Sequence, residues 1–591
     1  MFVLGISCHY HDAAAALLQD GLLVAAAEEE RFSRKKHDHS YPQQAIAFCL
    51  EQAGITSRDL DYVVFYEKPL PKFERVLMTS LHATPYSLAP FREAMISWLK
   101  EKLWVKSLLI GKLGIDGKKV LFVDHHVSHA ASALFCSPFE EAAIITADGV
   151  GEWTTTTVGR GRAPFGGTGT AELHLHKELR FPHSLGLLYS AFTSFLGFEV
   201  NEGEYKVMGM APYGEPRFVD DVLKVVDIAA DGSFQLDMRY FAFHRSTSQT
   251  IGRKFLELFG EPRHPEAEFI TRLTNGAVAG LDADLEASQR YADIAASVQQ
   301  VTEEVLLRLA RHAYEITGLK QLCLAGGVAL NSVANGRILR EGPFDELFIQ
   351  PAAGDSGGAL GAALYAHHIL LGQPRRFVME HAYWGKAYGE AAVVETLRAE
   401  GARFEVIDQE DRLVDRVVER IEAGDVVGWY QGGFEWGPRA LGHRSIIADP
   451  RRAEMKELVN RKIKFREPFR PFAPSVLAER ASEYFEIEDA ERQFPARFML
   501  LVAPVRANRG DEIAAVNHLG TARLQAVRHQ ESPRYYRLIE QFGQATGTPM
   551  LLNTSFNLRG EPIVNTPANA LHTFHRGGME LLVMDNVIVH S

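Results

Sequence analysis

The amino-acid sequence predicts an α/β protein with at least two domains. A chain of 591 residues is too long for one hydrophobic core. Apolar segments at 2–7, 13–19 and 22–27 alternate with polar turns, which is typical of strands joined as hairpins. A similar succession of strand, acidic turn and strand recurs at 142–158. Together these observations indicate a duplicated α/β domain of the actin and sugar-kinase type.

Two glycine-rich turns follow further along the chain. Residues 322–327 (LCLAGG) end an apolar segment on a Gly-Gly pair, and a helix is predicted from about 329 to 340. Residues 348–368 predict a strand, a loop that holds Asp355, and a second helix. Both turns would present backbone N–H groups at the start of a helix, an arrangement that suits phosphate.

The periodic pattern lapses around 370–390, where proline, glycine and aromatic residues cluster. We therefore predict a domain junction there, with one domain at 1–375 and a second at 385–591 that is large enough to fold alone. In the second domain we expect a helix near 390–400 and strands at 425–430 and 580–588.

Charge and composition narrow the class of protein. The net charge of −12 argues against nucleic acid as the main partner. The four cysteines are scattered and form no CxxC pair, which argues against a disulfide framework or a zinc ribbon. No signal peptide is evident, and no apolar run reaches the roughly 18 residues of a membrane span. We expect a cytoplasmic enzyme without a membrane partner, and its oligomeric state stays open.

Two histidines in the segment DHHVSHAASALF have the spacing of a metal-binding pair. On a helix, His125 and His129 share one face and can bind the same ion. Asp148 and Asp355 are each expected in a turn after a strand, where the carboxylates of open α/β sheets gather. Two imidazoles and two carboxylates suit a divalent transition metal such as iron or zinc. The alternative is that the histidines only cover or cap the helix, and His126 competes for the same role.

His11 and Asp12 directly follow the first predicted strand. A histidine at the mouth of a sheet can act as a general base, and a simple turn residue is the alternative. Because consecutive side chains tend to point apart, we expect the group that orients His11 to be a residue other than Asp12.

The segment NEGEYKVMGMAPYG carries alternating charged and apolar residues ahead of a predicted tight loop. Glu204 and Lys206 are its candidate binding residues. A solvated charged loop explains the same spacing equally well.

The C-terminal half concentrates basic residues within an acidic protein. They lie in the segments 432–445, 460–475 and 518–525, and the segment 553–557 adds hydroxyl and amide groups. Guanidinium groups bind phosphate and carboxylate oxygens in pairs, so these segments predict an anion cage. The alternative is surface arginine paired with acids such as Glu467. The candidate cage consists of Arg439, Arg444, Lys464, Arg466, Arg470 and Arg523, with Ser555.

These segments together resemble the NodU/CmcH-type carbamoyltransferase family, which includes nodulation proteins and antibiotic O-carbamoyltransferases. The matching phrases occur in order over nearly the whole chain. They include HDAAAAL (11–17), EEERFSRKKHD (28–38), DHHVSHAASA (124–133), NEGEYKVMGMAPYG (201–214), LAGGVALNSVANGRI (324–338), PAAGDSGGALGAAL (351–364), GPRALGHRS (437–445), KFREPFRPFAPSV (464–476) and NTSFN (553–557).

The resemblance implies a fold and a reaction. The N-terminal domain is expected to be Kae1-like, an actin-like ATPase fold with duplicated RNase H-like halves, and the C-terminal domain YrdC-like. The C-terminal domain would make carbamoyl-adenylate from carbamoyl phosphate and ATP, the latter with Mg²⁺. The N-terminal domain, with Fe²⁺ or another divalent transition metal, would pass the carbamoyl group to a hydroxyl of a small molecule.

The resemblance also assigns residues. It implies His11 as the catalytic histidine and the four candidate ligands above as the metal set. Carbamoyl-adenylate would contact Glu204, Lys206, Gly326, Gly327 and Asn331. Carbamoyl phosphate and ATP would contact Arg439, Arg444, Lys464, Arg470, Arg523 and Ser555.

A natural-product acceptor, as in antibiotic biosynthesis, is the expected acceptor class. The sequence leaves three rival functions open. One is synthesis of threonylcarbamoyl-adenosine on tRNA, which the net charge disfavours. Another is a non-catalytic nucleotide-binding module of the actin or Hsp70 type, which would need no arginine cage. The third is a metallopeptidase, but the histidine pair lacks the glutamate of HExxH.

Overall fold

The computed structural model describes residues 1–84, 88–100, 102–167, 169–246, 248–271 and 282–590. Contacts group the chain into two compact units. The N-terminal unit consists of Met1–His9, Ala15–Val24 and Leu50–Val378, and the C-terminal unit consists of Tyr10–Ala14, Ala25–Cys49 and Met379–Ser591. Two short segments from the start of the sequence therefore belong with the C-terminal part.

Two five-stranded sheets in the N-terminal half have the same strand order. The first runs β3-β2-β1-β4-β5 and the second, read from its other edge, runs β8-β7-β6-β11-β12. In both, the last three strands of this order are parallel. The repeat confirms the predicted α/β class and the duplication. The strands are β1 (Phe2–Ser7), β2 (Ala14–Gln19), β3 (Leu22–Glu28), β4 (Tyr62–Phe65), β5 (Val120–Phe122), β6 (Glu141–Ala147), β7 (Thr154–Arg162), β8 (Glu172–Arg180), β11 (Gln321–Ala325) and β12 (Glu346–Ile349).

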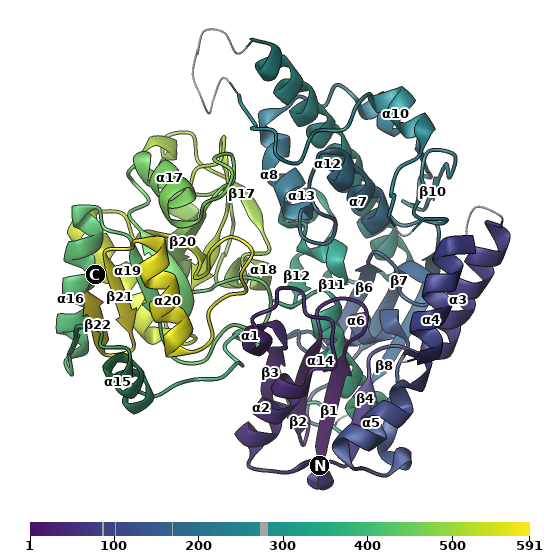
Figure 1. The fold of residues 1–591 in the computed structure, drawn as a ribbon, viewed down its shortest axis with the longest axis horizontal. Coiled ribbons are helices and arrows are strands. Elements are labelled where there is room, and N and C mark those ends of the chain that lie inside the picture. The colour runs from purple at the N-terminus through teal and green to yellow at the C-terminus, as the bar shows by residue number, and fades with distance from the viewer. Residues whose placement is uncertain (85–87, 101, 168, 247, 272–281, 591) are drawn as a thin grey trace. The chain divides into compact units, whose positions relative to one another are not determined.

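Helices α6 (His125–Leu134) and α14 (Asp355–Tyr365) pack against each other in the N-terminal unit, and α14 also contacts β1 (Figure 1). Small residues allow the close approach, because a β-carbon at Gly361 would overlap the backbone of Ser128. Each helix begins a few residues after a parallel strand, β5 or β12. Their first turns therefore lie at the carboxyl ends of strands, where ligands of open α/β sheets bind.

Further helices complete the N-terminal unit. The long helix α12 (Asp282–Thr317) contacts α7 (Leu185–Phe195), α8 (Glu204–Met210) and α13 (Ser332–Glu341). The segment that was expected to end in a tight loop instead forms α8 and a short 3₁₀ turn at Ala211–Tyr213. The others are α3 (Pro69–His82), α4 (Leu88–Lys100), α5 (Val105–Leu113), α9 (Val219–Val222) and α10 (Arg253–Phe259), with a small hairpin of β9 (Val226–Ile228) and β10 (Phe234–Leu236).

An eight-stranded mixed sheet forms the centre of the C-terminal unit, in the order β13-β22-β21-β14-β15-β20-β16-β19. Its strands are β13 (Phe404–Val406), β14 (Val427–Tyr430), β15 (Arg444–Ala448), β16 (Ala473–Leu477), β19 (Gln525–Val527), β20 (Met550–Ser555), β21 (Leu581–Met584) and β22 (Val587–His590). A separate pair joins β17 (Val502–Pro504) to β18 (Thr521–Arg523).

Helices α16 (Glu410–Ala423) and α19 (Pro533–Thr546) pack together and bury apolar side chains against this sheet. Trp429 is part of that core, so alternate residues of β14 face these helices. Other helices of the unit are α15 (Glu390–Ala399), α17 (Glu454–Leu458), α18 (Phe494–Arg497) and α20 (Pro567–Gly577). Helix α1 (Glu30–Ser33) and most of α2 (Gln43–Ala53) lie in one of its N-terminal segments.

The predicted closing strand at 580–588 is wrong in one respect. The segment contains two strands, β21 and the start of β22, paired antiparallel. Asp585 separates them and adopts φ 50°. A residue in this left-handed region makes a tight hairpin turn, and the polar pair Asp585-Asn586 is the turn signal that the single-strand prediction overlooked.

Arg31 ties an N-terminal segment into the C-terminal unit. Its Nη2 donates a hydrogen bond to the carbonyl oxygen of Gly437 at 2.6 Å, and its Nε lies 3.7 Å from Glu28 Oε2. The N–H of Gly437 donates to Glu28 Oε1 at 2.7 Å. All of these groups are buried, and burial raises the pKa of Glu28 to about 7.

Replacing Arg31 with methionine should lower the free energy of unfolding by about 3–5 kcal/mol, the usual cost of removing one partner from a buried ion pair. Glu28→Gln should cost less, because glutamine still accepts the hydrogen bond from Gly437. Exposed Lys35→Met should change stability by less than about 0.5 kcal/mol. Chemical denaturation of the three variants measures this. Equal stability of Arg31→Met and the wild type would contradict the assignment of this segment to the unit.

Candidate functional site

The four predicted metal ligands meet in one cluster of the N-terminal unit. His125 Nε2 lies 3.0 Å from His129 Nε2 and 3.0 Å from Asp148 Oδ2. Asp355 Oδ1 lies 3.6 Å from the Nε2 atoms of both histidines. Each residue offers one ligand atom, and the four atoms lie within 4.8 Å of one another. All four side chains are buried.

The electrostatics of this cluster favour a positive charge at its centre. Burial alone would lower the pKa of His125, but Asp355, Asp148 and Glu67 together raise it to about 10. Burial would likewise raise the pKa of Asp148, yet the two imidazoles hold it well below its usual range. Two nitrogen and two oxygen donors around such a point fit a divalent transition metal.

Neighbouring groups hold the ligands in place. The N–H of Gly327 donates to Asp148 Oδ1 at 2.8 Å, and Tyr66 Oη lies 3.5 Å from Asp355 Oδ2. The carboxylate of Glu152 accepts from the backbone N–H of His125 at 3.0 Å and so satisfies the first turn of α6. These contacts join residues far apart in the sequence, so no local pattern could have predicted them.

His126 does not belong to the cluster. Its Nδ1 is 2.6 Å from Thr146 Oγ1, and its Nε2 is 2.9 Å from the carbonyl oxygen of Thr154. Burial and the two neighbouring histidines lower its pKa well below the usual value, so the ring stays neutral. Both nitrogens of His126 therefore contact residues of β6 and β7. The spacing alone left open whether His126 or His125 joins His129 in the cluster, and these contacts exclude His126.

The residues expected to contact carbamoyl-adenylate lie in two places. Gly326 and Gly327 form the turn after β11, and Gly327 donates to Asp148 of the His₂Asp₂ cluster as described. Gly326 has φ 93°, and a β-carbon there would overlap the backbone of Ala147, so the turn requires glycine.

The other three belong to helices around α12. Asn331 caps α13 and exchanges hydrogen bonds at 3.1 Å with the side-chain amide of Gln299. Glu204 Oε1 accepts from Ser190 Oγ at 2.8 Å. Lys206 Nζ lies 5.4 Å from the centre of the Phe198 ring. Glu204 is therefore a hydrogen-bonded helix residue, and the alternative of a solvated loop does not hold for it.

His11 belongs to the C-terminal unit, in a cluster with Asp12 and His37. Asp12 Oδ2 accepts from His11 Nδ1 at 2.8 Å, and Asp12 Oδ1 accepts from His37 Nδ1 at 2.8 Å. The expectation that Asp12 could not orient His11 is wrong. Asp12 adopts φ 27°, and this turn of the backbone brings two consecutive side chains to the same side.

Lys464 and Ser555 come together in the C-terminal unit. Lys464 Nζ donates to Asn557 Oδ1 at 2.6 Å, to the carbonyl oxygens of Ser555 and Asn557, and to Ser555 Oγ at 3.3 Å. Burial lowers the pKa of Lys464 well below its usual value, and the charges of Arg466, Arg470 and Lys36 lower it further. An anion at this position would relieve that repulsion.

Arg444 has a different role from the other predicted cage residues. It is fully buried, and its guanidinium donates to the carbonyl oxygens of Gln431 at 2.7 Å and Gly432 at 2.9 Å. The group also lies 3.5 Å from the centre of the Tyr430 ring. These contacts shape the loop that contains Arg439, which precedes β15.

The remaining arginines of the predicted cage lie on separate segments of the C-terminal unit. Arg523 ends β18. Arg470 Nη1 is 3.6 Å from Glu467 Oε2, so the alternative of acid pairing applies to it in part.

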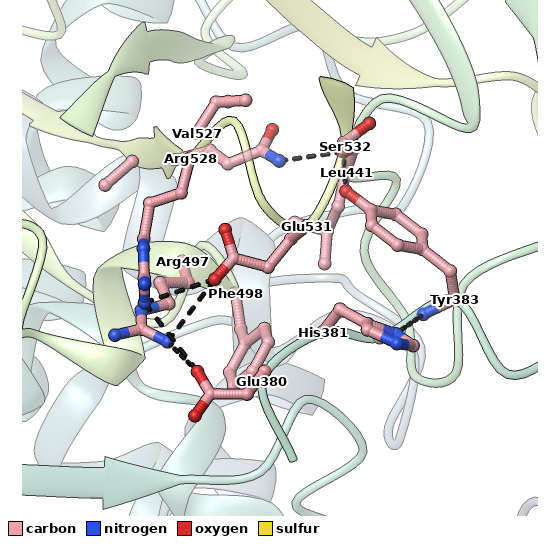
Figure 2. A pocket seen from close by; sticks show the side chains of 13 residues that line it. Glu380, His381, Tyr383, Leu441, Arg497, Phe498, Val527, Arg528, Glu531 and Ser532 are labelled. Atoms are coloured by element: carbon pink, nitrogen blue, oxygen red, sulfur yellow. Dashed lines mark hydrogen bonds and ion pairs between the residues drawn. The ribbon is translucent and has the colours of Figure 1, made fainter. Parts of the chain in front are cut away.

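A pocket in the C-terminal unit lies next to two arginines that sequence reasoning missed (Figure 2). Arg497 Nη1 is 2.6 Å from Glu380 Oε2, and Arg528 Nη1 is 3.1 Å from Glu531 Oε1. In the described part of the chain, the predicted cage residues are not among those that line this pocket. Its arginines already face carboxylates, so it differs in charge from the surroundings of Lys464.

The N-terminal unit thus holds a buried His₂Asp₂ cluster, and the C-terminal unit holds buried and half-buried basic side chains around Lys464. The family model for the carbamoyltransferase N-terminus matches residues 2–364, and that for the carbamoyltransferase C-terminus matches residues 418–591. The chain belongs to the carbamoyltransferase family. It is therefore an enzyme, and the interpretation as a non-catalytic module is set aside.

Relatives extend over the same length of chain. Uncharacterized protein sll1178 of Synechocystis is 47% identical over 99% of this chain and 96% of its own length. Nodulation protein NolNO of Sinorhizobium fredii is 38% identical over 98% of this chain and 79% of its own. The 3'-hydroxymethylcephem-O-carbamoyltransferase of Amycolatopsis lactamdurans is 35% identical over 45% of this chain and 48% of its own.

Among the described residues, no helix combines the length and apolar character that crossing a membrane requires.

Proposed function

We propose that this enzyme transfers a carbamoyl group from carbamoyl phosphate to a hydroxyl of a small molecule, with ATP as co-substrate. In the first step, water takes the phosphoryl group of carbamoyl phosphate and releases carbamate. A carbamate oxygen then attacks the α-phosphorus of ATP, and pyrophosphate leaves. In the second step, the acceptor oxygen attacks the carbamoyl carbon of carbamoyl-adenylate, and AMP leaves with the bonding electrons.

The observation that carries the first step is Lys464, buried in a field of positive charge. Carbamoyl phosphate and ATP together bring several negative charges, and a buried cation with neighbouring guanidinium groups stabilises them best. Ser555 and Asn557 hold the lysine in place. We assign this region, with Arg439, Arg470 and Arg523 as further contacts, to carbamoyl-adenylate formation.

The His₂Asp₂ cluster supports a metal-dependent second step. His125, His129, Asp148 and Asp355 would hold the ion, and a divalent cation bound there would neutralise the phosphate of the leaving AMP. The turn of Gly326 and Gly327, with Glu204, Lys206 and Asn331, is proposed to bind carbamoyl-adenylate beside it. Iron is the proposed metal, and a natural product is the proposed acceptor class. The cephem relative is named an O-carbamoyltransferase, which supports transfer to oxygen.

The direct test is incubation of the purified enzyme with ATP, Mg²⁺ and carbamoyl phosphate. Mass spectrometry should detect carbamoyl-adenylate, and coupled assays should detect pyrophosphate and inorganic phosphate in equal amounts. Omission of carbamoyl phosphate should remove the pyrophosphate signal. Pyrophosphate release that does not depend on carbamoyl phosphate would reject the proposed first step.

His11 is proposed to take the proton from the acceptor hydroxyl. An alcohol is almost entirely protonated at neutral pH, and a positioned imidazole can accept its proton as the new C–O bond forms. His11→Asn should leave carbamoyl-adenylate formation intact and slow transfer by about 10²–10⁴-fold. Transfer from supplied carbamoyl-adenylate at the wild-type rate would exclude this role.

A further inference from the structure

One carboxylate holds two imidazoles in the C-terminal unit. The two oxygens of Asp12 are each 2.8 Å from an Nδ1 atom, one of His11 and one of His37. The two rings lie 4.9 Å apart between their centres, with an angle of 37° between their planes. A carboxylate can only accept, so each histidine must carry its hydrogen on Nδ1. Each Nε2 is then the basic nitrogen of a neutral ring.

Unusual backbone angles and backbone hydrogen bonds hold the three side chains of this cluster in place. Asp12 and His37 adopt φ 27° and φ 52°, values that non-glycine residues rarely show. The N–H of Ala13 donates to the carbonyl oxygen of Asp38 at 2.7 Å, which joins the two segments beside the cluster. The N–H of His37 donates to Glu30 Oε2 at 2.9 Å. Such strained positions persist where the surrounding structure fixes them, often at functional sites.

We propose that Asp12 and His37 are positioning residues for His11. Asp12 fixes the tautomer and orientation of His11. His37 shares the Asp12 carboxylate, so that His11 holds a proton less firmly than it would beside Asp12 alone. The proposal rests on the proposed role of His11 as the base. The side chains of His11, Asp12 and His37 are each about a quarter to a third exposed, whereas the Nε2 atoms of both histidines are themselves buried.

The shared carboxylate explains why a second histidine is useful. When His11 takes the proton of the acceptor hydroxyl on Nε2, the acceptor oxygen forms its bond to the carbamoyl carbon and AMP departs. The imidazolium formed is stabilised by the negative charge of Asp12. If Asp12 bonded to His11 alone, its negative charge would favour the protonated form of His11 more strongly, and less of the neutral base would be present. The N–H of His37 takes up part of that negative charge.

Burial would raise the pKa of Asp12, but hydrogen bonds from His11 and His37 outweigh it and hold the pKa far below its usual value. Glu30 and Asp38 are the neighbouring acids, and Lys35 lies 3.8 Å from Asp38. Removal of the Asp12 charge should therefore lower the titration midpoint of His11, and removal of the His37 donor should raise it.

The test uses the full chain and four variants. Asp12→Asn removes the negative charge. His37→Leu removes the N–H donor, whereas His37→Asn keeps an N–H near the position of Nδ1. His39→Asn changes an exposed histidine nearby and is the control. Exchange of the ring Cε1 hydrogen with deuterium, followed by mass spectrometry of the peptide that carries His11, gives the titration midpoint of His11 without any substrate.

We expect the midpoint of His11 to fall by about 1–3 pH units in Asp12→Asn, the usual effect of a neighbouring opposite charge. It should rise in His37→Leu and return to the wild-type value in His37→Asn and His39→Asn. The acid limb of the transfer rate should shift in the same directions, with pyrophosphate release unchanged. The variants could show the expected shifts in the titration midpoint of His11 while the wild type forms no carbamoyl-adenylate. That result would support the positioning roles of Asp12 and His37 and reject the proposed function.

Two results would overturn the proposal. One is an unchanged midpoint of His11 in both Asp12→Asn and His37→Leu, which would make the contacts merely structural. The other is a second equivalent of transition metal in the wild type that His37→Leu and His37→Asn both lose, which would make the three side chains metal ligands. Metal analysis of the same samples decides this.

Discussion

Replacing Arg470 with alanine should slow carbamoyl-phosphate-dependent pyrophosphate release by about 30- to 1000-fold. Each charged contact to a buried anion is worth roughly 2–4 kcal/mol, which sets this range. Arg470 contributes to the positive field around Lys464, and its side chain is only 17% exposed. Arg439→Ala should give a loss of the same order. Arg470→Lys should recover part of the rate, because it keeps the charge without the paired donors.

Lys464→Met tests the same proposed anion site by removing the lysine that the neighbouring arginines surround. Lysine is buried there and donates to Ser555 and Asn557, so its removal should abolish carbamoyl-adenylate formation. Lys462→Met, an exposed change two residues away, is the matched control and should retain the wild-type rate. Thermal denaturation of each variant separates loss of function from loss of fold. A folded Lys464→Met protein that releases pyrophosphate normally would place the anion site elsewhere.

The duplicated sheet and the His₂Asp₂ cluster were predictable for the same physical reason. Hairpin signals at 13–27 and 142–158 are local, and turn residues such as Asp20 and Gly21 adopt the positive φ that such turns need. His125 and His129 follow from helix periodicity alone. Spacing could not decide about His126, because its partners Thr146 and Thr154 lie on strands that only the fold brings close.

The surroundings of His11 were less predictable. The expectation that consecutive side chains diverge assumes ordinary backbone angles, and Asp12 departs from them. His37 was part of a recognised phrase, EEERFSRKKHD, but nothing in that phrase states which side chain it meets. The packing of Ala25–Cys49 with the C-terminal unit is likewise a long-range property. Local propensity carries no information about such contacts, whereas the hydrogen bonds of Arg31 and Glu28 to Gly437 show them directly.

The wild-type enzyme, purified without chelators, should contain about one transition-metal ion per chain, and His129→Ala should contain almost none. His129 Nε2 lies 3.0 Å from His125 Nε2 and 3.6 Å from Asp355 Oδ1, so its loss removes one of four donors. Even second-sphere changes commonly weaken metal binding 10- to 100-fold, so loss of a ligand should weaken it by more than about 100-fold. His126→Asn, on the same helix, should keep the metal, because asparagine can still bond to Thr146.

Loss of the metal should affect the two steps of the reaction differently. Carbamoyl-adenylate formation should be unaffected in His129→Ala, because it is assigned to the Lys464 region, whereas transfer to an acceptor should be lost. Treatment of the wild type with a chelator should reproduce the same separation without any substitution, and re-addition of Fe²⁺, Zn²⁺ or Mn²⁺ one at a time should identify the ion that restores transfer. A metal-free wild type with full transfer activity would refute the metal site, and a His129→Ala protein that keeps its metal would refute this ligand set.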